Sequence, residues 1–83
     1  MRRDELWSIS MARICAFFDT QADLLPTDTG YQYRDCQITL TEVPPNPTAR
    51  FAMPRTQVVF EGSDQAVSDI YHRFFIQFLT AGG

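Results

Sequence analysis

Residues 63–79 read SDQAVSDIYHRFFIQFL, and this stretch decides the fold. Its apolar residues recur at the i, i+3, i+4, i+7 spacing of an amphipathic helix, and its polar residues fall mostly on the other side. Ser63 or Asp64 can cap the first turn, and Gly82 stands where a left-handed C-terminal cap belongs. The pattern predicts a helix over about 64–80. Its apolar stripe consists of Val67, Ile70, Tyr71, Phe74 and Phe78.

A helix with so much aromatic surface needs an apolar layer to cover it. The chain has 83 residues, of which 45% are hydrophobic and 13% aromatic, so one small domain with a packed core is expected. A domain of this size buries only about 60–65% of its unfolded surface. Its stability is therefore marginal unless a disulfide, a metal or a second subunit contributes. The charged fraction of 20% favours a partner surface.

The N-terminal region predicts a second amphipathic helix, over about 4–20, with Asp4 as its cap. Leu24-Leu25-Pro26 ends this region, because proline disfavours a helical conformation at the residue before it. The seam of this predicted helix consists of Trp7, Met11, Ile14 and Phe18.

The middle of the chain alternates apolar and polar residues, as half-buried strands do. It predicts strands over about 34–43 and 55–61. Tyr31 and Tyr33 have the opposite parity, so either Arg34-Asp35 forms a bulge or the first strand begins there. Residues 44–54 contain prolines that cannot donate to a sheet, and they are interpreted as the tip of a long hairpin.

The resulting fold class is α+β in the order α-β-β-α, two amphipathic helices packed on an antiparallel hairpin. A two-stranded hairpin is marginal in water and has two unpaired edges. A second copy of the chain would extend the sheet, and Ile76 and Leu79, which lie outside the helical stripe, would meet across the dimer. The alternative is a monomer with a third strand from Tyr31–Tyr33 or Phe51–Met53.

Charge and motifs argue against the commonest chemistries. The net charge is −3 and the pI about 4.8, so nucleic-acid binding is not expected as the main role. The chain lacks a G-x-S-x-G, a phosphate-binding glycine loop and an H-E-x-x-H motif. Its one histidine, His72, falls on the polar side of the predicted helix. We therefore expect no catalytic residues, no metal site and no cofactor. Four aspartates are interpreted as solvated surface charge: Asp19, Asp23, Asp28 and Asp35.

Two cysteines, Cys15 and Cys36, are too few for a disulfide framework. They are interpreted as two semi-buried thiols in a reducing cytosol, with a single Cys15–Cys36 bridge as the alternative. The longest apolar run is only Ile14 to Phe18, and no targeting segment or membrane span is recognised. A cytoplasmic location is expected.

The hairpin tip is the main candidate for a functional surface, as an arm that grips another protein. A polyproline ligand, a stiff loop and a DNA-wedging ribbon between Arg50 and Arg55 are the alternatives. The expected partner-binding residues are Pro44, Pro45, Pro47, Arg50, Phe51, Met53 and Arg55.

The chain ends in Gly82-Gly83, and on this one feature it is similar to sulfur-carrier and ubiquitin-like proteins. The resemblance implies an unhindered C-terminal carboxylate that can be adenylated. The predicted order of elements departs from those families, because their fold places two hairpins around one central helix. A glycine cap after the last helix is the alternative interpretation.

The function predicted from these features is a small acidic protein–protein interaction module: an adaptor, a chaperone-like factor or a protein inhibitor, without catalytic activity. The alternative is a small-ligand-binding or enzymatic domain with a pocket between helices and sheet. Its walls would be Trp7, Phe18, Tyr71 and Phe74, with Tyr33, Arg34 or Cys36 as polar contacts. Nucleic-acid contact through the Arg50–Arg55 ribbon is the third possibility.

Overall fold

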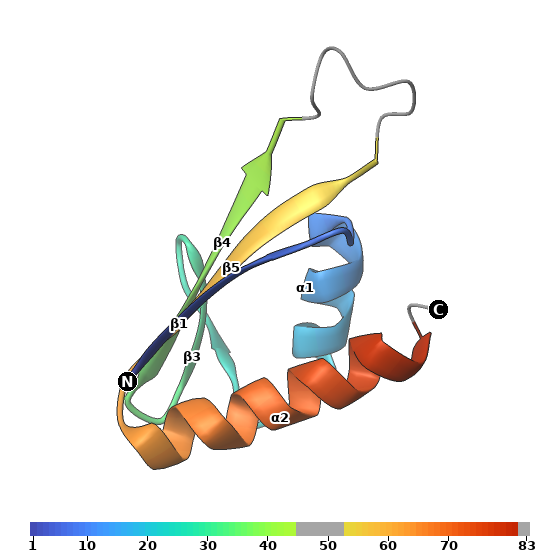
Figure 1. The fold of residues 1–83 in the computed structure, drawn as a ribbon. Helices are drawn as coiled ribbons and strands as arrows, with labels where there is room; N and C mark the ends of the chain where they lie inside the picture. The colour runs from blue at the N-terminus through green and yellow to red at the C-terminus, as the bar shows by residue number, and fades with distance from the viewer. Residues whose placement is uncertain (45–52, 82–83) are drawn as a thin grey trace.

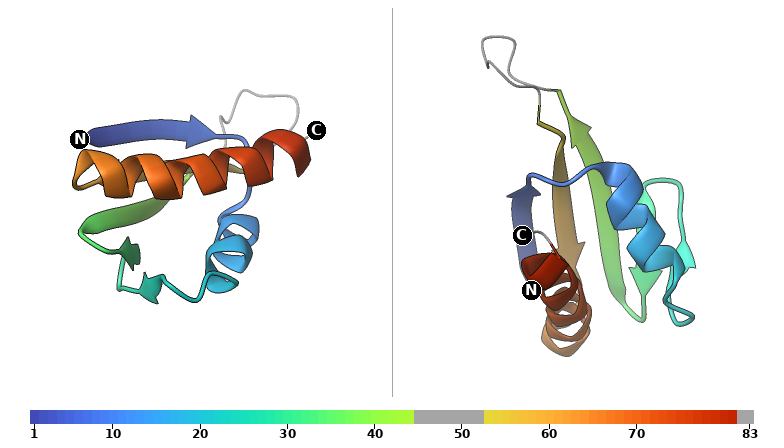
Figure 2. Two further views of the ribbon diagram at one scale, coloured as in Figure 1. Left: turned by 90° about the horizontal axis from the view of Figure 1, so that it is seen from below. Right: turned by 90° about the vertical axis from the view of Figure 1, so that its right-hand side faces the viewer.

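A computed structural model describes residues 1–44 and 53–81 and has an α+β fold (Figure 1). Five antiparallel strands form one sheet in the order β1-β5-β4-β3-β2, and both helices lie on the same face of it (Figure 2). The elements in chain order are β1 (Arg2–Trp7), α1 (Met11–Asp19), β2 (Leu25–Pro26), β3 (Gly30–Tyr33), β4 (Cys36–Val43), β5 (Arg55–Glu61) and α2 (Asp64–Ala81).

The α-β-β-α order with a helix over 4–20 was wrong at the N-terminus, where β1 precedes a shorter α1. All six residues of β1 pair with β5, from Arg2 opposite Glu61 to Trp7 opposite Thr56. Strand pairing satisfies the backbone edge that β5 would otherwise expose. The helix begins after Ser10, whose side chain accepts a hydrogen bond from the Arg13 N–H at 3.3 Å.

The parity change between the tyrosines and Cys36 has a simple cause. Arg34, with φ of 54°, and Asp35 form a tight two-residue connection between β3 and β4. Tyr33 then pairs with Cys36 and Tyr31 with Ile38, so all four side chains point to the helix-covered face. Neither a bulge nor a delayed start is needed, because the third strand is β3 itself. The predicted extension of the sheet by a second copy is therefore not required to pair Cys36–Thr39 of β4, which β3 already covers.

The helix predicted over 64–80 corresponds to α2, and the predicted apolar stripe lies against the sheet. Val67, Ile70 and Phe74 have no exposed surface, and Phe78 is buried. Ser63 caps the first turn of the helix. Its hydroxyl accepts a hydrogen bond from the Ala66 N–H at 3.3 Å and donates one to the Asp35 carboxylate at 2.8 Å.

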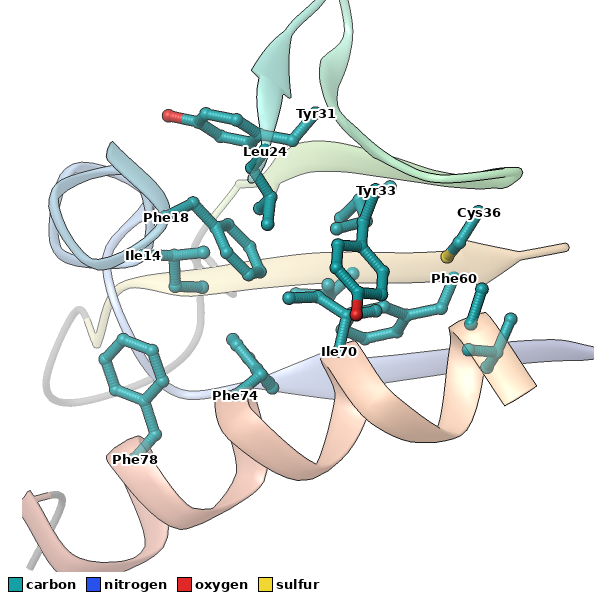
Figure 3. Packing of buried hydrophobic residues seen from close by; sticks show 14 of the residues in the cluster. Ile14, Phe18, Leu24, Tyr31, Tyr33, Cys36, Phe60, Ile70, Phe74 and Phe78 are labelled. Atoms are coloured by element: carbon teal, nitrogen blue, oxygen red, sulfur yellow. The ribbon is translucent and has the colours of Figure 1, made fainter. Parts of the chain in front are cut away.

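The core is aromatic and lies between the two helices and the sheet (Figure 3). Phe74 is at its centre, with its ring 5.0 Å from that of Trp7, 5.8 Å from Phe18 and 5.6 Å from Phe60. Edge-to-face and offset contacts of this kind add to the burial of apolar surface. This packing fills the space between the layers.

Candidate interaction surface

The outer ends of β4 and β5 form a two-stranded arm that reaches beyond the rest of the sheet (Figure 1). β3 pairs with β4 only from Cys36 to Thr39, and the remaining residues of β4 pair with β5 alone. On the other side, β1 pairs with β5 only as far as Thr56. Within residues 1–44 and 53–81, Thr41 to Val43 therefore have one strand neighbour instead of two, which leaves a free backbone edge on β4.

One hydrogen bond shows which residues of β4 point their backbone N–H and C=O groups toward the free edge. The Leu40 N–H donates to the Thr29 carbonyl at 2.9 Å, so Leu40 directs its backbone groups toward the β3 side. Because backbone groups alternate in direction along an antiparallel strand, Glu42 directs its N–H and C=O the same way. Beyond Thr29, the described residues place no strand beside Glu42. These two groups are the centre of the free edge.

The described part of the predicted partner-binding set lies at the end of this arm. Pro44 is exposed, Met53 is 58% exposed, and Arg55 is half-buried. The Arg55 guanidinium donates to the Pro44 carbonyl at 2.8 Å and so joins the two strands where the tip begins. Pro45, Pro47, Arg50 and Phe51 lie outside the described residues.

Other residues singled out in the sequence serve structural contacts. The side chains expected to line a cavity pack on one another, as Trp7 and Phe18 do on Phe74. Tyr71 also contacts Phe60, with ring centres 5.5 Å apart. The pocket predicted between helices and sheet with these four aromatic side chains as its walls is therefore not formed.

The three proposed polar contacts of that pocket are likewise placed elsewhere. Tyr33 is buried and donates to Asp69 at 3.1 Å, Arg34 is exposed in a turn, and Cys36 is fully buried. Burial raises the pKa of the Cys36 thiol. Cys15 and Cys36 are both free thiols, so they are not bridged.

The prediction that the four aspartates are only solvated surface charge was wrong for three of them, which make polar contacts. Asp23 receives two hydrogen bonds from Arg73, each 3.0 Å long, and these hold the pKa of its carboxyl below the usual value. Asp19 accepts from the Tyr31 hydroxyl at 2.6 Å, and Asp35 binds the residue that caps α2. They join elements that are distant in the sequence. Asp28 alone matches the prediction of an exposed carboxylate without a polar contact in the described structure.

Sequence reasoning missed a charged cluster on the helix-facing side of β1. Glu5 accepts hydrogen bonds from Arg3, from Trp7 and from Tyr71, each at 2.9–3.0 Å. Arg3 also stacks over the Tyr71 ring at 3.9 Å. The sequence did contain a sign of this strand, because Arg3, Glu5 and Trp7 follow one another at every second position, as residues on one face of a strand do. It was hidden because charges occupy both faces of this strand.

Two cavities lie near the surface. An open groove of about 520 Å³ is lined by α1 and the C-terminal part of α2, where the Phe17 and Phe78 rings contact each other with their centres 5.7 Å apart. A pocket of about 270 Å³ lies between α1, the β2–β3 turn and Leu40 of β4. The described residues contain no cluster of His, Cys, Asp or Glu side chains suited to a metal ion. Within the same residues, no helix has the length and apolarity needed to cross a membrane.

Comparison with curated proteins gives no significant match, and comparison with solved structures gives none either. A protein-family model matches residues 3–83, which is nearly the whole chain. The chain belongs to the family of archaeal MoaD-like proteins.

Proposed function

We propose that this chain is a small acidic protein–protein interaction module, without catalytic activity, that holds an extended segment of another protein along the free edge of β4. It would act as an adaptor, a chaperone-like factor or an inhibitor. The observation that carries the proposal is the outward N–H and C=O of Glu42, at the centre of an edge where β3 has ended. Unpaired edges of this kind are templates for strand addition.

The end of the arm supports the same role. Met53 exposes an apolar side chain at the end of the arm, on the β5 side, and the Arg55–Pro44 hydrogen bond joins the two strands at the point where the tip begins. A strand partner would gain main-chain hydrogen bonds from β4 and apolar contact from Met53. The whole chain has a net charge of −3, which favours a partner segment with basic residues.

Proline at position 42 tests this mode of binding. Glu42→Pro removes the outward N–H but keeps the bonds between β4 and β5, because the paired groups belong to the neighbouring residues. Glu42→Gln is the matched control, since it removes the charge and keeps the donor. The three proteins would be used to capture partners from a lysate of the source organism, with quantitative mass spectrometry as the readout.

At least one protein should be retained by the wild type and by Glu42→Gln, and lost with Glu42→Pro. Met53→Asp should weaken the retention of the same protein. If Glu42→Pro, with an unchanged circular dichroism spectrum, retains every protein that the wild type retains, the edge does not bind partners.

We also propose that the chain forms a homodimer. Ile76 is 48% exposed and Leu79 is 60% exposed, as expected for residues outside the helical stripe. In the described part of the chain, β1 is an edge strand of the sheet, so its outer edge has no strand neighbour over Arg2–Trp7. Both features favour association of two subunits.

The C-terminal Gly82-Gly83 supports a second candidate function, ATP-dependent activation of the terminal carboxylate. Both glycines lie outside the described residues. The family description likens its members to MoaD, and the diglycine is the feature by which the tail resembles sulfur carriers. The arrangement before it differs from two hairpins around one helix, because one strand precedes α1 and the last element is α2. Incubation with ATP and an activating enzyme, followed by intact mass, tests this function through an adenylate or a thiocarboxylate.

A further inference from the structure

The 270 Å³ pocket opens beside the free edge of β4, and the two features together define the kind of segment that would bind. Leu40 belongs to both: it lines the pocket, and it is the last residue of β4 whose outward N–H is occupied. The pocket is smaller than the roughly 300–1,000 Å³ of most small-molecule sites, so it suits one side chain better than a cofactor. Its main lining residues are Met11, Cys15, Pro26, Thr29, Tyr31 and Leu40.

The walls combine apolar side chains with the polar residues Thr27, Asp28 and Thr29, and the polar group of Tyr31 is already engaged. The hydroxyl of Tyr31 donates to Asp19 at 2.6 Å and also contacts the Cys15 carbonyl at 3.3 Å, which leaves the ring as a wall. The turn that closes one side is held by the Thr27 N–H, which donates to the Gly30 carbonyl at 2.9 Å. Gly30 lies so close to β4 that a Cβ atom there would be 2.0 Å from the Ile38 oxygen.

The register of an added strand points one side chain at this pocket. Residues directly opposite each other in an antiparallel pair project to the same face of the sheet. Glu42 has the same parity as Ile38 and Leu40, so it projects to the helix-covered face. The partner residue opposite Glu42 therefore projects to that face too. Thr29 lies opposite Leu40, so this partner residue would follow Thr29 along β4 by a distance of two residues. Its neighbours there are Leu40 and the pocket.

Two carboxylates near the pocket indicate which residues the bound segment should carry next to the side chain that enters the pocket. Asp28 is an exposed residue of the pocket lining. Glu42, also exposed, follows the pocket residue Leu40 by two positions on β4. Thr29 already occupies the position opposite Leu40, so a cation two positions from the residue opposite Glu42 would lie on the Pro44 side, as a diagonal neighbour of Glu42. Two carboxylates near one apolar opening thus favour a partner with a basic residue close to its apolar anchor.

We infer that the pocket is an anchor site for one apolar side chain, of leucine size, in an extended protein segment that pairs with Glu42 and carries a basic residue two positions away. This inference rests on the proposed function and adds the chemistry of the bound segment. The backbone edge supplies affinity for any extended segment, and the pocket and its two carboxylates supply selectivity.

The pocket contains its own chemical reporter. Cys15 is partly exposed and lines the pocket, whereas Cys36 is fully buried, so a maleimide should modify Cys15 alone. The probe is the capped peptide acetyl-Lys-Thr-Leu-Thr-Lys-amide, with its central leucine replaced by alanine or aspartate in two matched peptides. Binding is followed by amide chemical shifts of β4 and by the rate of maleimide addition to Cys15.

The leucine peptide should bind about tenfold or more tightly than the alanine peptide, because burial of a leucine side chain accounts for a difference of that size. It should slow the alkylation of Cys15 and shift the amide of Glu42. The aspartate peptide should do neither. Prior alkylation of Cys15 with a bulky maleimide should abolish the preference for leucine, and a Cys15→Ser protein treated in the same way should keep it.

Equal binding of the three peptides, with an unchanged rate of Cys15 alkylation, would overturn the anchor site and leave strand addition at β4 intact. Absence of any binding by the leucine peptide would also overturn it. The capture experiment with Glu42→Pro is independent of these peptides, so a failure of the anchor site and a failure of the proposed function are distinguishable.

Discussion

The hydroxyl of Tyr71 on α2 donates to both carboxylate oxygens of Glu5 on β1, at 2.9 and 3.0 Å, across 66 positions of the chain. The same carboxylate accepts hydrogen bonds from Arg3 and Trp7. This contact joins β1, an edge strand of the sheet, to the C-terminal helix α2. Burial alone would raise the pKa of Glu5, but the hydrogen bonds outweigh it and lower the pKa below the ordinary value of 4.5.

We predict that Glu5→Gln destabilises the protein at neutral pH and that the difference vanishes in acid. A carboxyl whose pKa is lowered by folding contributes stability above its unfolded pKa, and that stability is lost as the pH falls through the folded value. Loss of the charged hydrogen bonds should cost about 1–3 kcal/mol at pH 7. Chemical denaturation of both proteins between pH 7 and pH 3 measures the difference. A difference that stays constant with pH would contradict the role given to the Glu5 charge.

The hydroxyl of Thr56 donates to the carbonyl of Ile9 at 2.7 Å, and Thr56 has no exposed surface. This bond fixes the connection between β1 and α1. Thr56→Val keeps the shape but leaves the Ile9 carbonyl without this donor, and should lower the free energy of unfolding by about 1–3 kcal/mol. Thr56→Ser retains the donor and should lose less. Urea denaturation compares the two variants, and a valine variant as stable as the serine variant would refute the prediction.

The close approach of Gly30 to β4 predicts that any side chain there is harmful. A Cβ would lie 2.0 Å from the Ile38 oxygen, which is backbone and cannot rotate away. Gly30→Ala should therefore destabilise the fold by about 1–3 kcal/mol through overpacking. Thr29→Ala, at the exposed neighbouring position, is the control and should change stability much less. Thermal unfolding followed by circular dichroism distinguishes them; equal stabilities would show that the turn adjusts.

The sequence predicted α2 and β5 well because each carries its own periodic signal. Four members of the predicted stripe, Val67, Ile70, Phe74 and Phe78, are buried and Tyr71 is half-buried. Thr56, Val58 and Phe60 share the covered face of β5. Prediction failed at β1, where Trp7 and Met11 are four positions apart and imitate a helical seam. Charges on both faces of Arg2–Trp7 concealed its alternation, and only pairing with β5, 49 to 59 positions further along the chain, makes it a strand.

The candidate site was accessible from the sequence only in part. The prolines near position 44 indicated a hairpin tip and an exposed Met53; the exposure of Met53 is confirmed, whereas most of the tip lies outside the described residues. The free edge at Glu42 could not be predicted, because it depends on where β3 stops pairing with β4. The pocket depends on the packing of α1 against the β2–β3 turn, and that packing leaves no pattern in either segment alone.

The exposed side chains of α2 lead to the last prediction, which concerns subunit association. Leu79 and Ile76 expose 60% and 48% of their surface. Substitution of either by glutamate would place a charge in the proposed interface, where an unpaired buried charge is strongly unfavourable. Light scattering after size exclusion should give a two-chain mass for the wild type and a one-chain mass for Leu79→Glu or Ile76→Glu.

Gln32→Glu adds the same charge at an exposed position of β3, on the face of the sheet that the helices do not cover, and should remain a dimer. A one-chain mass for the wild type at micromolar concentration would exclude the homodimer. A two-chain mass for both the Leu79→Glu and Ile76→Glu proteins would instead move the interface away from these residues. In that case the outer edge of β1, beside which the described residues place no second strand, becomes the surface that joins the subunits.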